Sequence, residues 1–377
     1  MEFTCPTVGL YIHIPYCQKK CPYCAFYSEF IKEHKPERLI DALFMELDQY
    51  AITEPLETIY IGGGSPSCLP DELLVQMVTF LTNQYKGVSE FTMECNPAQA
   101  NEATLKQLYA LGVNRLSIGA QSFDSKELKT LGRIHSPRQI IEAVRLAKKA
   151  GFENIGLDLM FGIPRSSMKT WRNSLKSAVA LDVQHISAYS LTIEKSTPFE
   201  HAVRKGKLTL IDELDERQMC KIARSFLRNE GFEQYEISNF AKPGFECRHN
   251  LRYWRNLPVI GIGPAAASWY EGKRATNTAS IKKYIKRIES GQSAQSEVFI
   301  PSPEQIASES AVLGLRMTEG VDMLEYQKQT GFNLIRLFAD AIKKHSFNGL
   351  LECTVDNHCR LTEKGLSYAD TVAADFI

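Results

Sequence analysis

The chain has 377 residues, with 44 basic residues balanced by 44 acidic ones and a hydrophobic fraction of 44%. This neutral balance gives no bulk attraction to nucleic acid, and no apolar run reaches the length of an integral membrane segment. The N-terminal residues Met1 to Cys5 lack the basic and apolar regions of a signal peptide, and the ten cysteines show no regular pairing, so we expect a cytoplasmic protein.

Short β-rich runs alternate with amphipathic segments between residues 10 and 190. We predict strands at residues 10–14, 58–62, 90–96, 115–120, 154–160 and 185–190. Helical patterns lie between them at residues 36–50, 70–85, 101–111, 136–150 and 167–181. Six such βα units predict an α/β fold with a parallel sheet, either open or curled into an incomplete (βα)6 barrel. A binding site is then expected at the carboxyl ends of the strands.

Directly after the first strand, Cys17, Cys21 and Cys24 follow one another with the spacing C-x3-C-x2-C. Thiolates are the ligands that hold iron-sulfur clusters, and three of them leave one iron of a [4Fe-4S] cluster without a protein ligand. That iron can take the amino and carboxylate groups of S-adenosylmethionine (SAM), which is then split reductively. Two alternatives stay open at this point, namely a zinc site with His13 as fourth ligand and three buried cysteines without a metal.

The ends of the later strands carry residues that are costly to bury. The second strand ends in the glycine run 62–64, whose backbone can approach a ligand closely. Glu94, Gln121 and Arg133 follow the next two strands, and Asp158 lies alone in an apolar run, where a charge needs a partner. A tight turn, a salt bridge or a helix cap could explain each one alone. Together they would converge on one opening above the cysteine loop.

These motifs resemble the radical SAM superfamily, and within it the branch of the oxygen-independent coproporphyrinogen III oxidase HemN and the haem chaperone HemW. The resemblance runs over nearly the whole chain. It rests on Tyr11-x-His13-x-Pro15-x-Cys17-x3-Cys21-x2-Cys24, on Gly62 to Pro66, on Glu94, on Gly119-x-Gln121-Ser122 and on Asp158 to Pro164. It implies an incomplete (βα)6 radical SAM barrel.

The resemblance also implies roles for individual residues. Cys17, Cys21 and Cys24 would hold the cluster, and Tyr11, Gly63 and Glu94 would contact the SAM bound to it. Relatives show a second SAM position, and the matching residues here are Tyr23, Gly64, Ser65, Gln121, Arg133 and Asp158. Ser65 stands where the family usually has threonine, and serine keeps the hydroxyl group.

A short aromatic motif follows the barrel region. His249, Asn250, Tyr253 and Trp254 form the pattern H-N-x-x-Y-W. A neutral imidazole can be an axial ligand of haem and flat rings pack against a porphyrin, although a simple packing cluster would show the same residues. The pattern resembles the haem-binding signature of the chaperone members of the family. That resemblance implies haem as a third cofactor, with His249 as the first candidate for its ligand.

We expect three regions: residues 1–230 as the barrel with the cluster and SAM sites, 231–300 as an extension with the haem motif, and 301–377 as a small domain. Between residues 190 and 245 only one helix is predicted, at 212–230. The last region predicts helices at 303–315, 322–330 and 333–344, strands at 350–355 and 358–361, and a closing helix from about 362, as in a winged-helix-like domain. Such domains often bind nucleic acid, but no basic stripe supports this here, so we expect a structural or partner-docking module.

Two functions fit the resemblance. The favoured one is a haem chaperone that binds haem, a [4Fe-4S] cluster and SAM, and transfers haem to an acceptor such as a respiratory haem protein. The alternative is an oxidase of porphyrin biosynthesis that decarboxylates coproporphyrinogen III to protoporphyrinogen IX. Phe26 stands where the oxidase has a further cysteine, and Tyr11 comes too early for the oxidase's N-terminal extension. Both features favour the chaperone and leave enzymatic activity open. A purely structural iron-sulfur protein would not need the SAM-binding residues.

Overall fold

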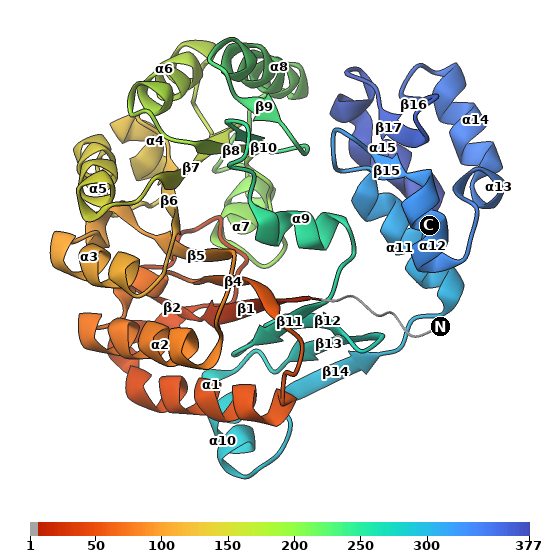
Figure 1. Ribbon diagram of the computed structural model, residues 1–377. Coiled ribbons are helices and arrows are strands. Elements are labelled where there is room, and N and C mark those ends of the chain that lie inside the picture. Colours follow the sequence, from red (N-terminus) through yellow and green to blue (C-terminus); the bar gives the residue numbers. More distant parts are fainter. Residues whose placement is uncertain (1–6) are drawn as a thin grey trace.

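Six parallel strands form the centre of the molecule in the computed structural model, which describes residues 7–377 (Figure 1). In order across the sheet they are β1 (Val8–Ile14), β4 (Leu56–Gly63), β5 (Glu90–Cys95), β6 (Arg115–Gln121), β7 (Asn154–Phe161) and β8 (His185–Ser190). All six were predicted from the sequence. Residues Met1 to Cys5, on which the prediction of no signal peptide rests, lie outside the described residues.

Apolar and polar side chains alternate along the strands, so the sheet has one apolar face and one polar face. In β1, Leu10, Ile12 and Ile14 belong to the main hydrophobic core and are at most 1% exposed. Tyr11 and His13, between them, point to the opposite face because successive side chains of a strand alternate. The apolar face packs against the helices, and the polar face lines the inside of the curved sheet.

The crossover helices cover the outer face of the sheet (Figure 1). The predicted ones are α1 (Pro36–Tyr50), α2 (Asp71–Gln84), α3 (Glu102–Ala110), α5 (Pro137–Ala150), α6 (Met168–Ala180) and α8 (Glu213–Asn229). Elements that the sequence analysis did not predict are β2 (Tyr16–Cys17), β3 (Glu29–Phe30), α4 (Ser125–Thr130), α7 (Pro198–Arg204) and α10 (Ile281–Glu289). Helix α5 shows why such boundaries were predictable, since Ser136 and Gln139 form a capping box and Gly151 ends the helix with φ 108°.

The barrel is incomplete because β1 and β8 each pair with a later strand. Beside β8 lie the antiparallel strands β10 (Asn239–Ala241) and β9 (Glu233–Gln234). Beside β1 lie β11 (Val259–Ile262), β12 (Ala267–Tyr270), β13 (Lys273–Asn277) and β14 (Gln295–Phe299). The segment 231–300 therefore extends both edges of one twelve-stranded sheet. Its strands are short, and the sequence analysis did not predict them. The proposed three-region division stays a prediction.

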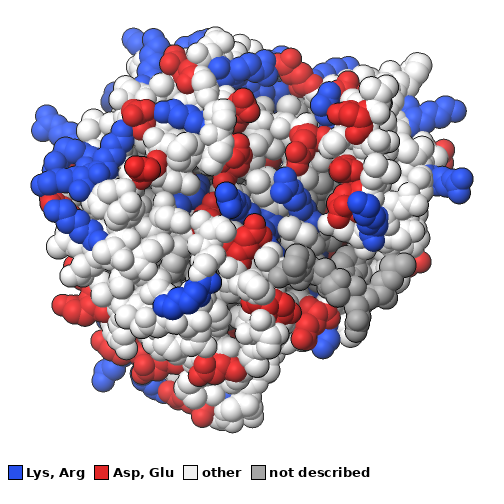
Figure 2. Space-filling view, in the orientation of Figure 1, with Lys and Arg blue, Asp and Glu red and all other residues white. Residues whose placement is uncertain are grey.

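The C-terminal domain has its own hydrophobic core and the predicted winged-helix-like arrangement. Its elements are α11 (Pro303–Gly314), β15 (Val321–Asp322), α12 (Met323–Thr330), α13 (Leu334–Leu337), α14 (Ala339–Phe347), β16 (Leu351–Cys353), β17 (His358–Leu361) and α15 (Ala369–Ala373). The helix predicted at 333–344 is broken at Phe338, whose ring packs on Phe376 with centroids 4.8 Å apart. The predicted closing helix starts later, as a 3-10 turn at Gly365–Tyr368 that leads into α15. In Figure 2, acidic side chains lie beside basic ones over this domain.

No helix within residues 7–377 combines the length and the apolar character needed to cross a membrane.

Candidate functional site

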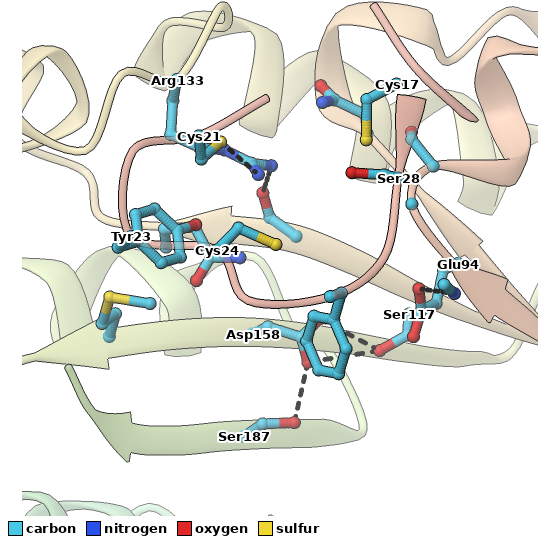
Figure 3. A pocket seen from close by; sticks show the side chains of 18 of the residues that line it. Cys17, Cys21, Tyr23, Cys24, Ser28, Glu94, Ser117, Arg133, Asp158 and Ser187 are labelled. Carbon is cyan, nitrogen blue, oxygen red and sulfur yellow. Dashed lines mark hydrogen bonds between the residues drawn. The ribbon is translucent and has the colours of Figure 1, made fainter. Parts of the chain in front are cut away.

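A cavity of about 740 Å³ lies inside the partial barrel, beneath the cysteine loop (Figure 3). It is lined by most of the residues predicted to bind the cluster or SAM: Cys17, Cys21, Tyr23, Cys24, Gly63, Gly64, Ser65, Glu94, Gln121, Arg133 and Asp158. Figure 3 shows the loop with the three cysteines on one side of the cavity and Glu94, Ser117 and Asp158, which project from strands, on the other. The fold thus brings these distant motifs together.

The three cysteines are half-buried free thiols. Burial raises the pKa of Cys17 and Cys24, and the neighbouring cysteines raise it further. The positive charge of Arg133 partly offsets this rise in pKa. Its Nη1 lies 3.8 Å from the Sγ of Cys21, and its Nη2 donates to the Gly119 carbonyl at 2.7 Å. A cationic group among the three sulfurs would compensate the thiolate charges.

A cubane cluster fits this arrangement better than a single metal ion. Within residues 7–377, no three His, Cys, Asp or Glu side chains are placed to hold one metal ion together. His13, the candidate fourth zinc ligand, uses both ring nitrogens, with Tyr11 Oη at 3.0 Å and the Tyr27 carbonyl at 3.0 Å. In a cubane cluster each thiolate binds a different iron, so the sulfurs need to surround one cavity and not one point.

Glu94 is held at the cavity wall by two donors. Tyr60 Oη donates to its Oε1 at 2.9 Å, and the backbone N–H of Gly63 donates to its Oε2 at 3.2 Å. Gly63 has φ 110°, and a Cβ there would lie 2.7 Å from the His13 ring, so the turn requires glycine. Burial, with a smaller contribution from Asp158, raises the pKa of Glu94 to about 7. The carboxylate is thus suited to a cationic ligand group that stabilises its charge.

The predicted partner of Asp158 exists, and it is a pair of hydroxyl groups. Ser187 Oγ donates to the Asp158 carboxylate at 2.8 Å and Ser117 Oγ donates at 3.2 Å (Figure 3). Burial raises the pKa of Asp158, and these hydroxyls lower it. Nearby, Gln121 has φ 65° and accepts a 2.8 Å hydrogen bond from Tyr189. Two carboxyl groups, Glu94 and Asp158, therefore share this half of the cavity.

Several lining residues were missed by the sequence analysis. Among them are Tyr60 of β4 and Arg115 and Ser117 of β6. The last two continue the alternation of Gly119 and Gln121, which the sequence motif already included, so four alternate residues of β6 line the cavity. The intervening residues of β6 are apolar, so the period-2 alternation was a readable signal. The interior of a complete barrel is normally filled by branched apolar side chains. A polar interior indicates a place for ligands.

The H-N-x-x-Y-W motif lies on α9 (Arg248–Trp254), which separates two cavities. Asn250 lines the first cavity, whereas Tyr253 and Trp254 line a second, apolar cavity of about 760 Å³ bounded by α9, α11 and residues of β12 to β14. His249 lines neither and is only 1% exposed. The structure therefore does not bring the four motif residues to one surface. Tyr11 also lies outside both linings.

His249 is a neutral imidazole inside an aromatic cluster. Its Nδ1 lies 2.8 Å from Thr58 Oγ1, and its Nε2 has no hydrogen-bond partner in the part of the chain that the structure describes. Its ring lies 5.2 Å from that of Tyr60 and 5.3 Å from that of Tyr253, between centroids. Burial, helped by Arg252 and Arg115, lowers the pKa of His249 to about 3.

Known proteins share this architecture. The model of the radical SAM superfamily matches residues 11–178, and the model of the HemN C-terminal domain matches residues 302–368. The heme chaperone HemW of Bacillus subtilis (strain 168) is 37% identical over 97% of this chain and 98% of its own length. The heme chaperone HemW of Escherichia coli (strain K12) is 33% identical over 99% of this chain and 98% of its own length.

Among solved structures, the coproporphyrinogen III oxidase HemN from Escherichia coli superimposes with a TM-score of 0.85 over 98% of this chain and 90% of that one. Its sequence identity is 21%, so this likeness shows a common fold. The relatives above 30% identity cover nearly the whole chain. The chain therefore belongs to the HemW family of the radical SAM superfamily.

Proposed function

We propose that this protein is a cytoplasmic haem chaperone that binds a [4Fe-4S] cluster, SAM and haem and passes haem to an acceptor protein, with respiratory haem proteins as candidates. The observation that carries the proposal is the near full-length similarity to proteins named heme chaperones, at 37% and 33% identity. The cavity supports it, because three thiols and a carboxylate with a raised pKa surround one space. A reducing compartment keeps such thiols available.

In this proposal Cys17, Cys21 and Cys24 hold the cluster. When bound, the cluster and SAM together supply reductive chemistry that no protein side chain provides. Glu94 and the Gly63 backbone bind SAM. Tyr11 acts indirectly, because it hydrogen-bonds to His13, whose ring lies against Gly63. Tyr23, Gly64, Ser65, Gln121, Arg133 and Asp158 would serve the second SAM position.

Haem would be bound through His249. With the proton on Nδ1 and donated to Thr58, the lone pair of Nε2 is free to ligate iron. Because His249 is 1% exposed and packed against Tyr253, ligation requires that Tyr253 move aside. Tyr253 and Trp254 already face the second cavity, whose apolar lining suits a porphyrin ring.

Replacing His249 with alanine is expected to raise the haem dissociation constant by about tenfold or more, since the axial ligand is lost. A titration followed at the Soret band measures this, and iron content and SAM binding should stay at the parent level. His345→Ala is the matched control, because His345 is equally buried but lies in the C-terminal domain beside Asp375. An unchanged titration in His249→Ala would place the haem ligand elsewhere.

Anaerobic turnover separates the chaperone from the oxidase. Reconstituted, reduced protein is mixed with SAM and coproporphyrinogen III, and tetrapyrroles are followed by mass. We expect no protoporphyrinogen IX, whereas haem-loaded protein should lose its haem to an added apo-form of a haem protein. Phe26, which stands where the oxidase has a cysteine, lines the cavity and is 68% exposed. Catalytic decarboxylation would overturn the proposed function.

A further inference from the structure

Arg115 is a buried cation whose hydrogen-bond donors are almost unused. It begins β6, is 1% exposed, and lines the barrel cavity. Within residues 7–377 its one hydrogen bond runs from Nη1 to Thr92 Oγ1 at 3.5 Å, the outer limit for such a bond. Its Nε has no partner, and no carboxylate oxygen of the described residues lies within 4.0 Å of the guanidinium. Burying a charge in this way is destabilising unless something compensates it.

Another arginine of this chain shows what full compensation looks like. Arg252 is similarly buried, at 2% exposure, but forms an ion pair with Glu57 and donates to the carbonyl oxygens of Thr7 at 2.7 Å and Pro258 at 3.0 Å. All three nitrogens of the Arg252 guanidinium therefore donate hydrogen bonds to groups of the protein. The contrast indicates that Arg115 is reserved for a partner that is not part of the chain.

The carboxylates around Arg115 are occupied by other donors. Glu90 accepts the backbone N–H groups of Arg248 at 2.9 Å and His249 at 3.0 Å, which fixes the start of α9. Glu94 and Asp158 accept the tyrosine, serine and backbone bonds described above. Burial lowers the pKa of Arg115, but the combined effect of Cys247, Glu90, Tyr60 and Tyr235 raises it above its usual value, so the guanidinium stays charged.

The neighbouring strand leaves room for this side chain. Gly156 of β7 lies beside Arg115, and a Cβ at Gly156 would be 3.2 Å from Nη2 of Arg115 and 3.3 Å from Nδ1 of His185. That Nδ1 is also without a partner among residues 7–377. Two polar side chains without full partners therefore lie beside Gly156, and one of them, Arg115, lines the cavity.

We propose that Arg115 recognises a carboxylate of the molecule that enters the barrel cavity. A guanidinium binds a carboxylate through two parallel N–H donors, and such pairs are strong in a site shielded from water. The inference rests on the proposed function, which offers two carboxylate sources. One is the methionyl carboxylate of SAM, which binds in the barrel cavity. The other is a propionate of haem, whose ring faces the second cavity and whose propionate would reach Arg115 past Asn250 of α9, which lines the barrel cavity. The residue is thus a specificity determinant that the resemblance to known relatives did not assign.

The test compares each ligand with an analogue that lacks the free carboxylate. Affinities for SAM and decarboxylated SAM, and for haem and haem dimethyl ester, are measured anaerobically on the cluster-reconstituted full chain. We expect the parent to prefer one carboxylate-bearing ligand by about tenfold or more, as for a charge-assisted hydrogen-bonded pair. Because the carboxylate of SAM also binds the open iron of the cluster, a preference for SAM in the parent does not by itself identify the partner of Arg115. The pair whose ratio falls by about tenfold in Arg115→Met identifies the source, and Arg115→Lys should restore part of that ratio.

Arg224→Met is the matched control, because Arg224 is also buried, at 5% exposure, but lies outside the linings of both cavities and donates to the Glu363 carbonyl at 3.2 Å. It should leave both ratios unchanged. If the parent shows no preference in either pair, the proposal is wrong. This outcome is measured on the parent alone and does not depend on whether a variant folds. Ratios that persist in Arg115→Met overturn it as well and leave Arg115 with a structural role. A parent that binds neither SAM nor haem overturns the proposed function together with this inference.

Discussion

Replacing Cys21 with alanine is expected to abolish the brown absorbance and most of the iron of the anaerobically reconstituted protein. Cys21 lines the cavity with Cys17 and Cys24, and burial makes the remaining two thiols hard to ionise without a metal centre. Three thiolates are the fewest that leave a single open iron on a cubane cluster. Losing one should therefore remove the cluster, and with it SAM bound at the open iron. Iron analysis and the visible spectrum measure the loss.

Cys220→Ala is the control for this experiment. Cys220 is also a half-buried free thiol, but it lies on α8, away from the cavity. Its replacement should leave the iron content at the parent level. Full iron content in Cys21→Ala would refute the ligand assignment, and a loss in Cys220→Ala would show that reconstitution depends on general stability.

SAM binding is expected to weaken as the pH falls below about 7, and to lose this dependence in Glu94→Gln. The pKa of Glu94 is raised to about 7 by burial, so the carboxylate of the ligand-free protein becomes protonated below that pH. The ammonium group of SAM needs the ionised form. One pH unit below the pKa, the ionised fraction has fallen about tenfold, and the dissociation constant should rise in proportion.

Above pH 8 the parent carboxylate is ionised, and Glu94→Gln should bind SAM about tenfold or more weakly because a charge-assisted hydrogen bond becomes a neutral one. Calorimetric titrations between pH 6 and 8.5 would measure both effects. The carboxamide has nearly the same shape: its oxygen can accept from the Gly63 N–H, and its NH2 group can donate to the Tyr60 hydroxyl, so packing changes little.

Glu46 provides a matched control. Burial also raises its pKa to about 7, but its carboxylate accepts hydrogen bonds from Tyr284, Asn277 and the Gly263 backbone, and it does not line the cavity. Glu46→Gln should leave SAM affinity and its pH profile unchanged. A pH dependence that survives in Glu94→Gln would mean that another group, such as Asp158, controls binding.

Local patterns in the sequence determined the parallel strands, most of the crossover helices and the cysteine loop. Each depends on neighbours in the chain: alternation in β1, the capping box at Ser136, and the spacing from Cys17 to Cys24. The convergence of Glu94, Gln121 and Asp158 was also predictable, because parallel strands end at one edge of a sheet.

Only the tertiary structure determined which strands pair across the sheet and which side chains become neighbours. The edge strands of segment 231–300 were missed because they are short and gain their stability from pairing with β1 and β8, which lie far away in the sequence. The same holds for His249, whose motif suggests an accessible ligand but whose ring is covered by Tyr60 and Tyr253. In the sequence Arg115 is simply an arginine at the start of a strand. Only the fold shows that the nearby carboxylates are occupied by other donors, because hydrogen-bond partners are set by three-dimensional neighbours and leave no local pattern.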